Sequence, residues 1–190
     1  MFMHDANVPE KLNAVSSLHF IFLSCLTGFV GAFVYPLMSY FLIDELNQPP
    51  IYIGIYMVSV TLSGLIISQW LGKLADKGTS SKKLYILANS GLAMALVVYT
   101  NTNQFWQILA AGIFLMAFGN ANIPLMLTLG RQWANKAEIN ITQFNARLRA
   151  GISMAWMIGP PVGFSLIAFS GFNAAFILAL LFALSGALFV

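Results

Sequence analysis

The distribution of charged residues constrains this chain more than any other feature. Only 8% of its 190 residues are charged, whereas a soluble domain has about 25%. No Asp, Glu, Lys or Arg occurs within residues 12–43, 46–72, 84–130 or 150–190. Because about 20 mostly apolar residues suffice for a helix to cross a bilayer, each of these stretches predicts at least one transmembrane helix.

The two longest stretches each contain a polar break. Residues 100–104 read Thr-Asn-Thr-Asn-Gln and residues 170–173 read Ser-Gly-Phe-Asn, so each stretch is divided into two predicted helices. An open sheet would leave unpaired backbone groups in lipid, and we therefore expect an all-α integral membrane fold. The six predicted transmembrane helices lie near residues 16–42, 51–72, 84–100, 105–130, 144–168 and 174–190.

The basic residues predict the orientation of these helices. All nine lie on the N-terminal tail, on the connection between the second and third spans, or around the connection between the fourth and fifth. Short loops rich in Lys and Arg stay in the cytoplasm, so we place the N-terminus and both basic connections there. The net charge of +3 then reflects topology, and we expect no nucleic-acid partner.

The residue types needed for catalysis or metal binding are scarce. Cys25 is the lone cysteine, His4 and His19 are far apart, and no acid lies within a predicted span. A membrane enzyme would need a nucleophile and a base, or a metal cluster, facing a cavity. We therefore expect no enzyme, no metal and no cofactor. A structural or assembly protein would also fit six helices, but it would not explain the motifs described below.

A short motif occurs twice along the chain. Residues 31–38 read GAFVYPLM and residues 119–126 read GNANIPLM, both following the pattern G-x4-P-L-M. The first copy falls in the outer half of the first span, and the second falls in the inner half of the fourth. This placement predicts a 3+3 inverted repeat of the kind that secondary transporters contain.

Prolines interrupt three of the predicted helices. Pro36, Pro124 and the pair Pro160-Pro161 each leave a backbone carbonyl four residues earlier without its helical partner. In a bilayer such carbonyls are tolerated where protein or a water-filled cavity satisfies them. We expect broken or bent segments in spans one, four and five that face a cavity. The alternative is that these prolines serve helix packing alone.

The connection between spans two and three resembles the signature loop of the major facilitator superfamily. Residues 72–84 read GKLADKGTSSKKL and match the start of G-x-L-a-D-r-x-G-r-k. Thr79 stands where that family has its second glycine, and serines replace its basic pair. In the family this loop latches two six-helix halves together, which implies a conformational role for Gly72, Asp76 and Lys77.

A second stretch resembles exporters of that superfamily. Gly159-Pro160-Pro161-Val162-Gly163 fits their G-P-x-x-G core on helix five, and residues 146–164, ARLRAGISMAWMIGPPVGF, resemble the bacterial sugar efflux transporters. The resemblance implies that residues 1–190 form the N-terminal six-helix half of a twelve-helix fold. The last predicted span ends at Val190 without a basic flank, so we expect this half to be part of something larger.

The resemblance also implies a function. It implies a carrier that exports sugars, glycosides or sugar analogues from the cytoplasm by alternating access, coupled to protons, across a bacterial inner membrane. Its partners would be the sugar, protons, membrane lipids and a C-terminal six-helix half on the same or a separate chain. The alternative is a multidrug/proton antiporter of the same superfamily, and an export independent of the pH gradient would instead indicate facilitated diffusion.

In this superfamily helices one and four line the N-terminal wall of the substrate site. On the first span, Ser24, Gly28, Gly31, Tyr35 and Ser39 fall on one helical face. On the fourth, Asn120 and Asn122 are about 200° apart on a helical wheel, so we expect one of them, Asn120, to face the cavity. An amide suits sugar hydroxyls because it both donates and accepts. The candidate substrate-binding residues are Asn120, Tyr35, Trp156, Asn122 and Ser39, with helix packing as the alternative role of each.

Overall fold

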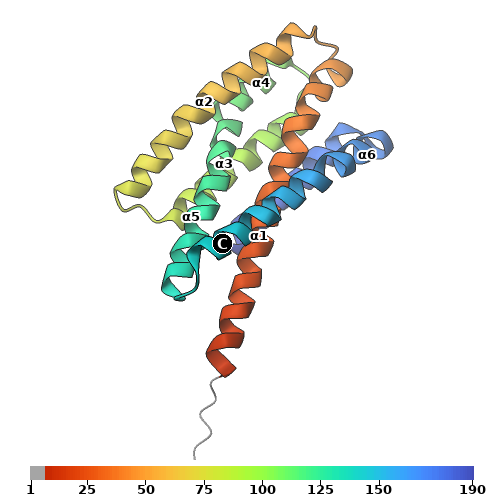
Figure 1. Ribbon diagram of the computed structural model, residues 1–190. Helices are drawn as coiled ribbons and strands as arrows, with labels where there is room; N and C mark the ends of the chain where they lie inside the picture. Colours follow the sequence, from red (N-terminus) through yellow and green to blue (C-terminus); the bar gives the residue numbers. More distant parts are fainter. Residues whose placement is uncertain (1–6) are drawn as a thin grey trace, which may run out of the picture.

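A computed structural model describes residues 7–190, and every regular element within this range is helical (Figure 1). Residues 1–6, which belong to the tail that the basic residues assign to the cytoplasm, lie outside the described residues. The elements are α1 (Asn7–Tyr40), the π-helical turn η1 (Phe41–Glu45), α2 (Ile51–Asp76), α3 (Ser81–Asn101), α4 (Phe105–Phe114), the 3-10 segment η2 (Met116–Ala121), α5 (Asn122–Lys136) and α6 (Ile141–Phe189).

The prediction of an all-α membrane fold is confirmed. Within the described residues, five helical stretches are long and apolar enough to cross a membrane. The first four coincide with the first four predicted spans, and the fourth comprises α4, η2 and α5 together. The fifth is α6, whose 49 residues cover both the fifth and the sixth predicted spans.

The predicted break between two helices at residues 170–173 is present in the structure. No loop separates the two halves of α6, and the helical geometry is lost at Gly171 alone, where φ is 79° and ψ is 174°. This backbone conformation is essentially restricted to glycine. A single glycine therefore changes the chain direction, and the polar residues around it remain helical.

The two halves of α6 run in opposite directions along α1. In the first half, Phe144 contacts Phe20, and a Cβ built on Gly163 would meet the Leu37 side chain, so this half runs parallel to α1. After Gly171 the order reverses. Phe176 packs on Phe41, Phe182 packs on Phe29 and Phe33, and the final turn contacts His19 through the Phe189 carbonyl at 2.6 Å. Figure 1 shows the C-terminus returning to the side of α1.

Small residues allow α1 and the first half of α6 to approach closely. A Cβ added to Gly28 would lie 2.9 Å from the Cβ of Ala155, and one added to Gly159 would lie 2.5 Å from the Cβ of Ala32. Without a hydrophobic driving force between helices in lipid, such small-residue contacts are a main source of helix association. The glycines of the Gly-Pro-Pro stretch therefore serve close packing against α1.

In two of the three helices, no break occurs at the prolines. α1 stays helical through Pro36, and α6 stays helical through Pro160 and Pro161. Only the fourth span is broken, and its break begins at Leu115, where α4 ends and the 3-10 segment starts. Pro124 lies in the first turn of α5, where a missing backbone donor is tolerated because those amides have no intrahelical partner.

The signature-like connection ends α2 with a Schellman motif. The amide of Thr79 donates to the Leu74 carbonyl, and the amide of Gly78 donates to the Ala75 carbonyl, both at 3.0 Å. Gly78 has a φ of 90°, which this motif requires of the residue after the helix cap. The glycine that stands one place earlier than in the family pattern is therefore the residue that terminates the helix.

The α1–α6 contact predicts a compensating pair of substitutions. Gly159→Ala places a methyl group against Ala32, and overpacking of this kind costs about 1–3 kcal/mol. We expect it to lower the thermal unfolding midpoint of the purified protein in detergent by several degrees. Ala32→Gly in the same molecule removes the opposing methyl and should restore most of the loss. If the unfolding midpoint of the double variant is no higher than that of Gly159→Ala, the close contact is not the cause of the destabilisation.

Candidate functional site

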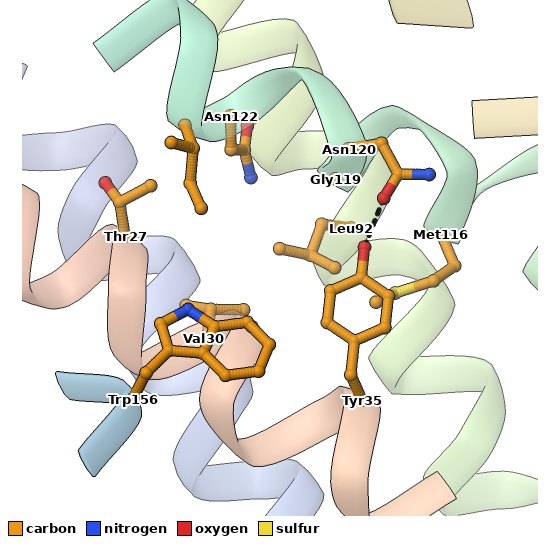
Figure 2. Close-up of a pocket in the computed structure, with 11 residues that line it drawn as sticks. Thr27, Val30, Tyr35, Leu92, Met116, Gly119, Asn120, Asn122 and Trp156 are labelled. Atoms are coloured by element: carbon orange, nitrogen blue, oxygen red, sulfur yellow. Dashed lines mark hydrogen bonds between the residues drawn. The ribbon is translucent and has the colours of Figure 1, made fainter. Parts of the chain in front are cut away.

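A cavity of about 130 Å³ lies where α1, the first half of α6 and the broken fourth span meet (Figure 2). It is partly open and mostly apolar, with a few polar groups that converge on it. Its lining residues are Thr27, Val30, Gly31, Tyr35, Leu92, Met116, Gly119, Asn120, Asn122, Ile123 and Trp156. Four of the five predicted substrate-binding residues therefore lie in one cavity.

A hydrogen bond joins the two helices that were predicted to line the site. The Tyr35 hydroxyl donates to Oδ1 of Asn120, connecting α1 to η2. The amide group of Asn120 also lies directly against Gly64 of α2. A Cβ built on Gly64 would overlap the amide nitrogen and lie 2.6 Å from Cγ of Asn120. Tyr35 and Gly64 together fix the position of this amide.

Two aromatic rings form the apolar part of the cavity wall. The rings of Tyr35 and Trp156 are nearly parallel, with an interplanar angle of 15° and centroids 6.2 Å apart. Trp156 lies over Gly31, whose Cβ position would be 3.3 Å from the indole Cζ2. Trp156 stays 38% exposed, so its ring is accessible to a ligand.

Both Asn120 and Asn122 line the cavity, so the expectation that only one would do so is wrong. The expectation assumed an α-helix, in which each residue advances by about 100°. The chain is 3-10 helical through Ala121, and each residue then advances by about 120°. Viewed down the helix axis, the smaller angle between the two amides is therefore about 120° in the 3-10 segment, whereas it would be about 160° in an α-helix.

The face of α1 that lines the cavity also differs from the prediction. The cavity contacts Thr27, Gly31 and Tyr35, which are spaced four residues apart. Ser24 and Gly28 pack against α6 instead. The residues that were predicted to form a single polar face are therefore divided between the cavity and the contact with α6. The reason is that α1 is covered by the fourth span and by both halves of α6.

One candidate residue lies outside the cavity. Ser39 is only partly buried and does not line it. Thr27, which the sequence analysis missed, does line it and is 5% exposed. Its spacing from Gly31 and Tyr35 was the available signal. Leu92 of α3 and Met116 of η2, by contrast, gave no signal because apolar residues fill every span.

The residues of the two family-like motifs lie away from the cavity. Asp76 and Lys77 are exposed at the end of α2, and a Cβ on Gly72 would meet nothing within 4 Å. The Gly-Pro-Pro stretch begins one turn of α6 beyond Trp156. Its glycines face α1, whereas Pro160 is half-buried and Pro161 is exposed.

A mostly apolar cavity with a few convergent polar groups is the usual form of a small-molecule site. Residues 20–190 match the sequence model of the Major Facilitator Superfamily, and the chain belongs to this superfamily of transporters.

The chain is similar to several curated sugar transporters. It is 30% identical over 174 residues to sugar efflux transporter C of Escherichia coli K12, covering 92% of this chain and 44% of that protein. It is 32% identical over 167 residues to sugar efflux transporter B of Salmonella typhimurium LT2, covering 86% and 42%. It is 30% identical over 189 residues to sugar efflux transporter A of Dickeya chrysanthemi, covering 99% and 48%. The chain thus spans about half the length of these relatives.

The contact between Gly64 and Asn120 predicts that a substitution at Gly64, which does not line the cavity, disrupts the cavity's polar wall. Gly64→Ala should displace the Asn120 amide and break its hydrogen bond to Tyr35. We expect the near-ultraviolet circular dichroism of the tyrosine and tryptophan side chains to change, and the unfolding midpoint to fall.

Gly54→Ala is the matched control, since it lies on the same helix and its added methyl meets nothing within 4 Å. It should leave both measurements unchanged. Equal effects of the two variants would contradict this role of Gly64.

Proposed function

We propose that this chain is the N-terminal half of a carrier that exports sugars, glycosides or sugar analogues from the cytoplasm. The observation that carries the proposal is the convergence of two amides and two aromatic rings on one cavity. The names of the similar proteins, which are sugar efflux transporters, point to the same class of substrate.

The chemistry of the cavity suits a sugar. A sugar ring has hydroxyl groups at its edge and C–H groups on its faces. Amides donate and accept hydrogen bonds, as hydroxyl groups require. An aromatic face carries partial negative charge and attracts the weakly positive C–H groups. Trp156, with its accessible ring, is suited to this stacking, and Asn120 and Asn122 are suited to the hydroxyl groups.

The architecture we propose has six membrane passes arranged as a 3+3 inverted repeat. The antiparallel halves of α6 supply the fifth and sixth passes, since each half lies along α1. The two G-x4-P-L-M motifs support the repeat, because both contribute residues to the cavity and Tyr35 of one bonds Asn120 of the other. A second six-helix half, on the same or a separate chain, would close the cavity from the opposite side.

Alternating access would then expose the cavity to each side of the membrane in turn. We assign Gly72, Asp76 and Lys77 to the cytoplasmic contact with the second half. Gly159, Pro160, Pro161 and Gly163 would keep α6 against α1 while the halves rock. The described carboxylates lie at helix ends or in connections, as with Asp44 and Glu45 of η1. A proton-coupling carboxylate, which carriers normally hold within the membrane, would accordingly lie in the second half.

Export assays can test the cavity directly. In cells expressing the intact transporter, Asn120→Ala and Trp156→Ala should each lower the export of a labelled galactoside about tenfold, which corresponds to about 1.4 kcal/mol of lost binding. Ser39→Ala, outside the cavity, should export normally. Unchanged export by both cavity variants would contradict the site. Export of a lipophilic cation in place of the galactoside would indicate the multidrug alternative.

The proposed orientation, with a cytoplasmic N-terminus in a bacterial inner membrane, has its own test. Cysteines are introduced singly at Ser80 or Asn103 in a Cys25→Ser background. A membrane-impermeant thiol reagent should label the cysteine at position 103 in intact cells, because we place that connection outside. It should label the cysteine at position 80 only after permeabilisation. The reverse pattern would overturn the orientation.

A further inference from the structure

A buried polar side chain outside the cavity connects to one of its amides. Asn89 of α3 is 2% exposed and does not line the cavity. The Asn122 amide nitrogen donates to Oδ1 of Asn89 at 3.4 Å. Asn122 is itself 4% exposed, so both side chains are enclosed by protein at membrane depth.

The orientation of the Asn89 amide is fixed by the backbone. Its Nδ2 donates to the carbonyl of Tyr85 at 3.1 Å, one turn earlier on α3. A carbonyl can only accept, so the nitrogen of Asn89 must face Tyr85 and its oxygen must face Asn122. Asn89 can therefore only accept from Asn122.

This arrangement fixes the orientation of Asn122 in turn. Its nitrogen must face Asn89, since the reverse orientation would place two amide oxygens against each other. Figure 2 shows the nitrogen of Asn122 on the cavity side of its amide. Its oxygen has no hydrogen-bond partner among the described residues and is closed off from solvent. An amide nitrogen has two hydrogens, so one remains to be donated into the cavity.

We propose that Asn89 is a positioning residue that makes Asn122 a hydrogen-bond donor to an oxygen of the substrate. The inference rests on the proposed function and adds a specificity to it. The substrate must carry an acceptor at the position that Asn122 reaches, while a donor there gains nothing from this side chain.

Substrate analogues distinguish a donor from an acceptor at this position. Each hydroxyl of an exported sugar is replaced in turn by hydrogen or by fluorine, and export is measured in cells expressing the intact transporter. Fluorine accepts weakly and does not donate, whereas hydrogen does neither. At the hydroxyl that Asn122 reaches, we expect the fluoro analogue to be exported about threefold better than the deoxy analogue, the lower end of what one net hydrogen bond contributes.

Asn89→Leu, of similar size, should weaken this preference. Asn122 is then free to turn over, so its donor faces the substrate only part of the time, and the fluoro-to-deoxy ratio should fall below that of the unmodified transporter. The parent sugar should still be exported, because a hydroxyl matches either orientation of the amide. A purely structural role of Asn89 would lower the export of every analogue alike and leave the ratio unchanged.

Two further variants keep the inference falsifiable if Asn89→Leu fails to reach the membrane. Asn89→Asp still accepts from Asn122 in either protonation state and should keep the ratio. Asn122→Leu should abolish it. Ser90→Ala is the matched control on α3, because the Ser90 hydroxyl is exposed and bonds only its own helix, at Ile86.

The outcomes separate the inference from the proposed function. Normal export of the parent sugar, with a ratio of about one at every hydroxyl of the unmodified transporter, overturns the inference alone. A fluoro-to-deoxy ratio that persists in Asn122→Leu also overturns the inference and leaves the proposed function intact. Failure of the unmodified transporter to export any sugar overturns the proposed function, and the role of Asn89 falls with it.

Discussion

The close contact between α1 and the first half of α6 determines where the cavity lies. Lipid tails are as apolar as leucine, so helices associate in a membrane only where their backbones can approach. Gly28, Gly159 and Gly163 provide that approach between residues 28 and 37 of α1. The contact brings Trp156 over Gly31, one turn from Tyr35, and thereby creates the aromatic wall. A bulkier residue in this contact would displace the aromatic wall although it touches no ligand itself.

The broken fourth span supplies the polar wall opposite. A regular α-helix would point Asn120 and Asn122 toward different neighbours, and one of them would face lipid or a packed helix. The 3-10 segment η2 turns both toward the cavity. Such irregular backbone is tolerated at membrane depth where it is buried in protein or lines a cavity. The irregularity and the site therefore depend on each other.

The sequence predicted the helices better than it predicted their faces. Charge-free stretches locate the spans because lipid excludes charge, whatever the packing of neighbouring helices. The position of Tyr35 in the cavity also followed from its spacing along the first span. The form of the break at residues 170–173 and the face expected for Ser39 did not. The first depends on the backbone angles of Gly171 alone, and the second depends on which helix covers each side of α1. Neither property belongs to a single span.

The buried polar groups of the α1, α3 and α5 region show how such a cavity is kept in one state. A buried amide without a partner costs about 1–3 kcal/mol, so polar residues at this depth normally pair fully. Thr27 donates to its own helix at the Leu23 carbonyl and lies 2.7 Å from the Tyr85 hydroxyl, which must then donate to it. Asn89 is equally committed through Tyr85 and Asn122. Thr27 and Asn122 are thus each paired with a buried group behind the cavity wall. The partners of both side chains, Tyr85 and Asn89, belong to α3, a helix that supplies only Leu92 to the cavity surface.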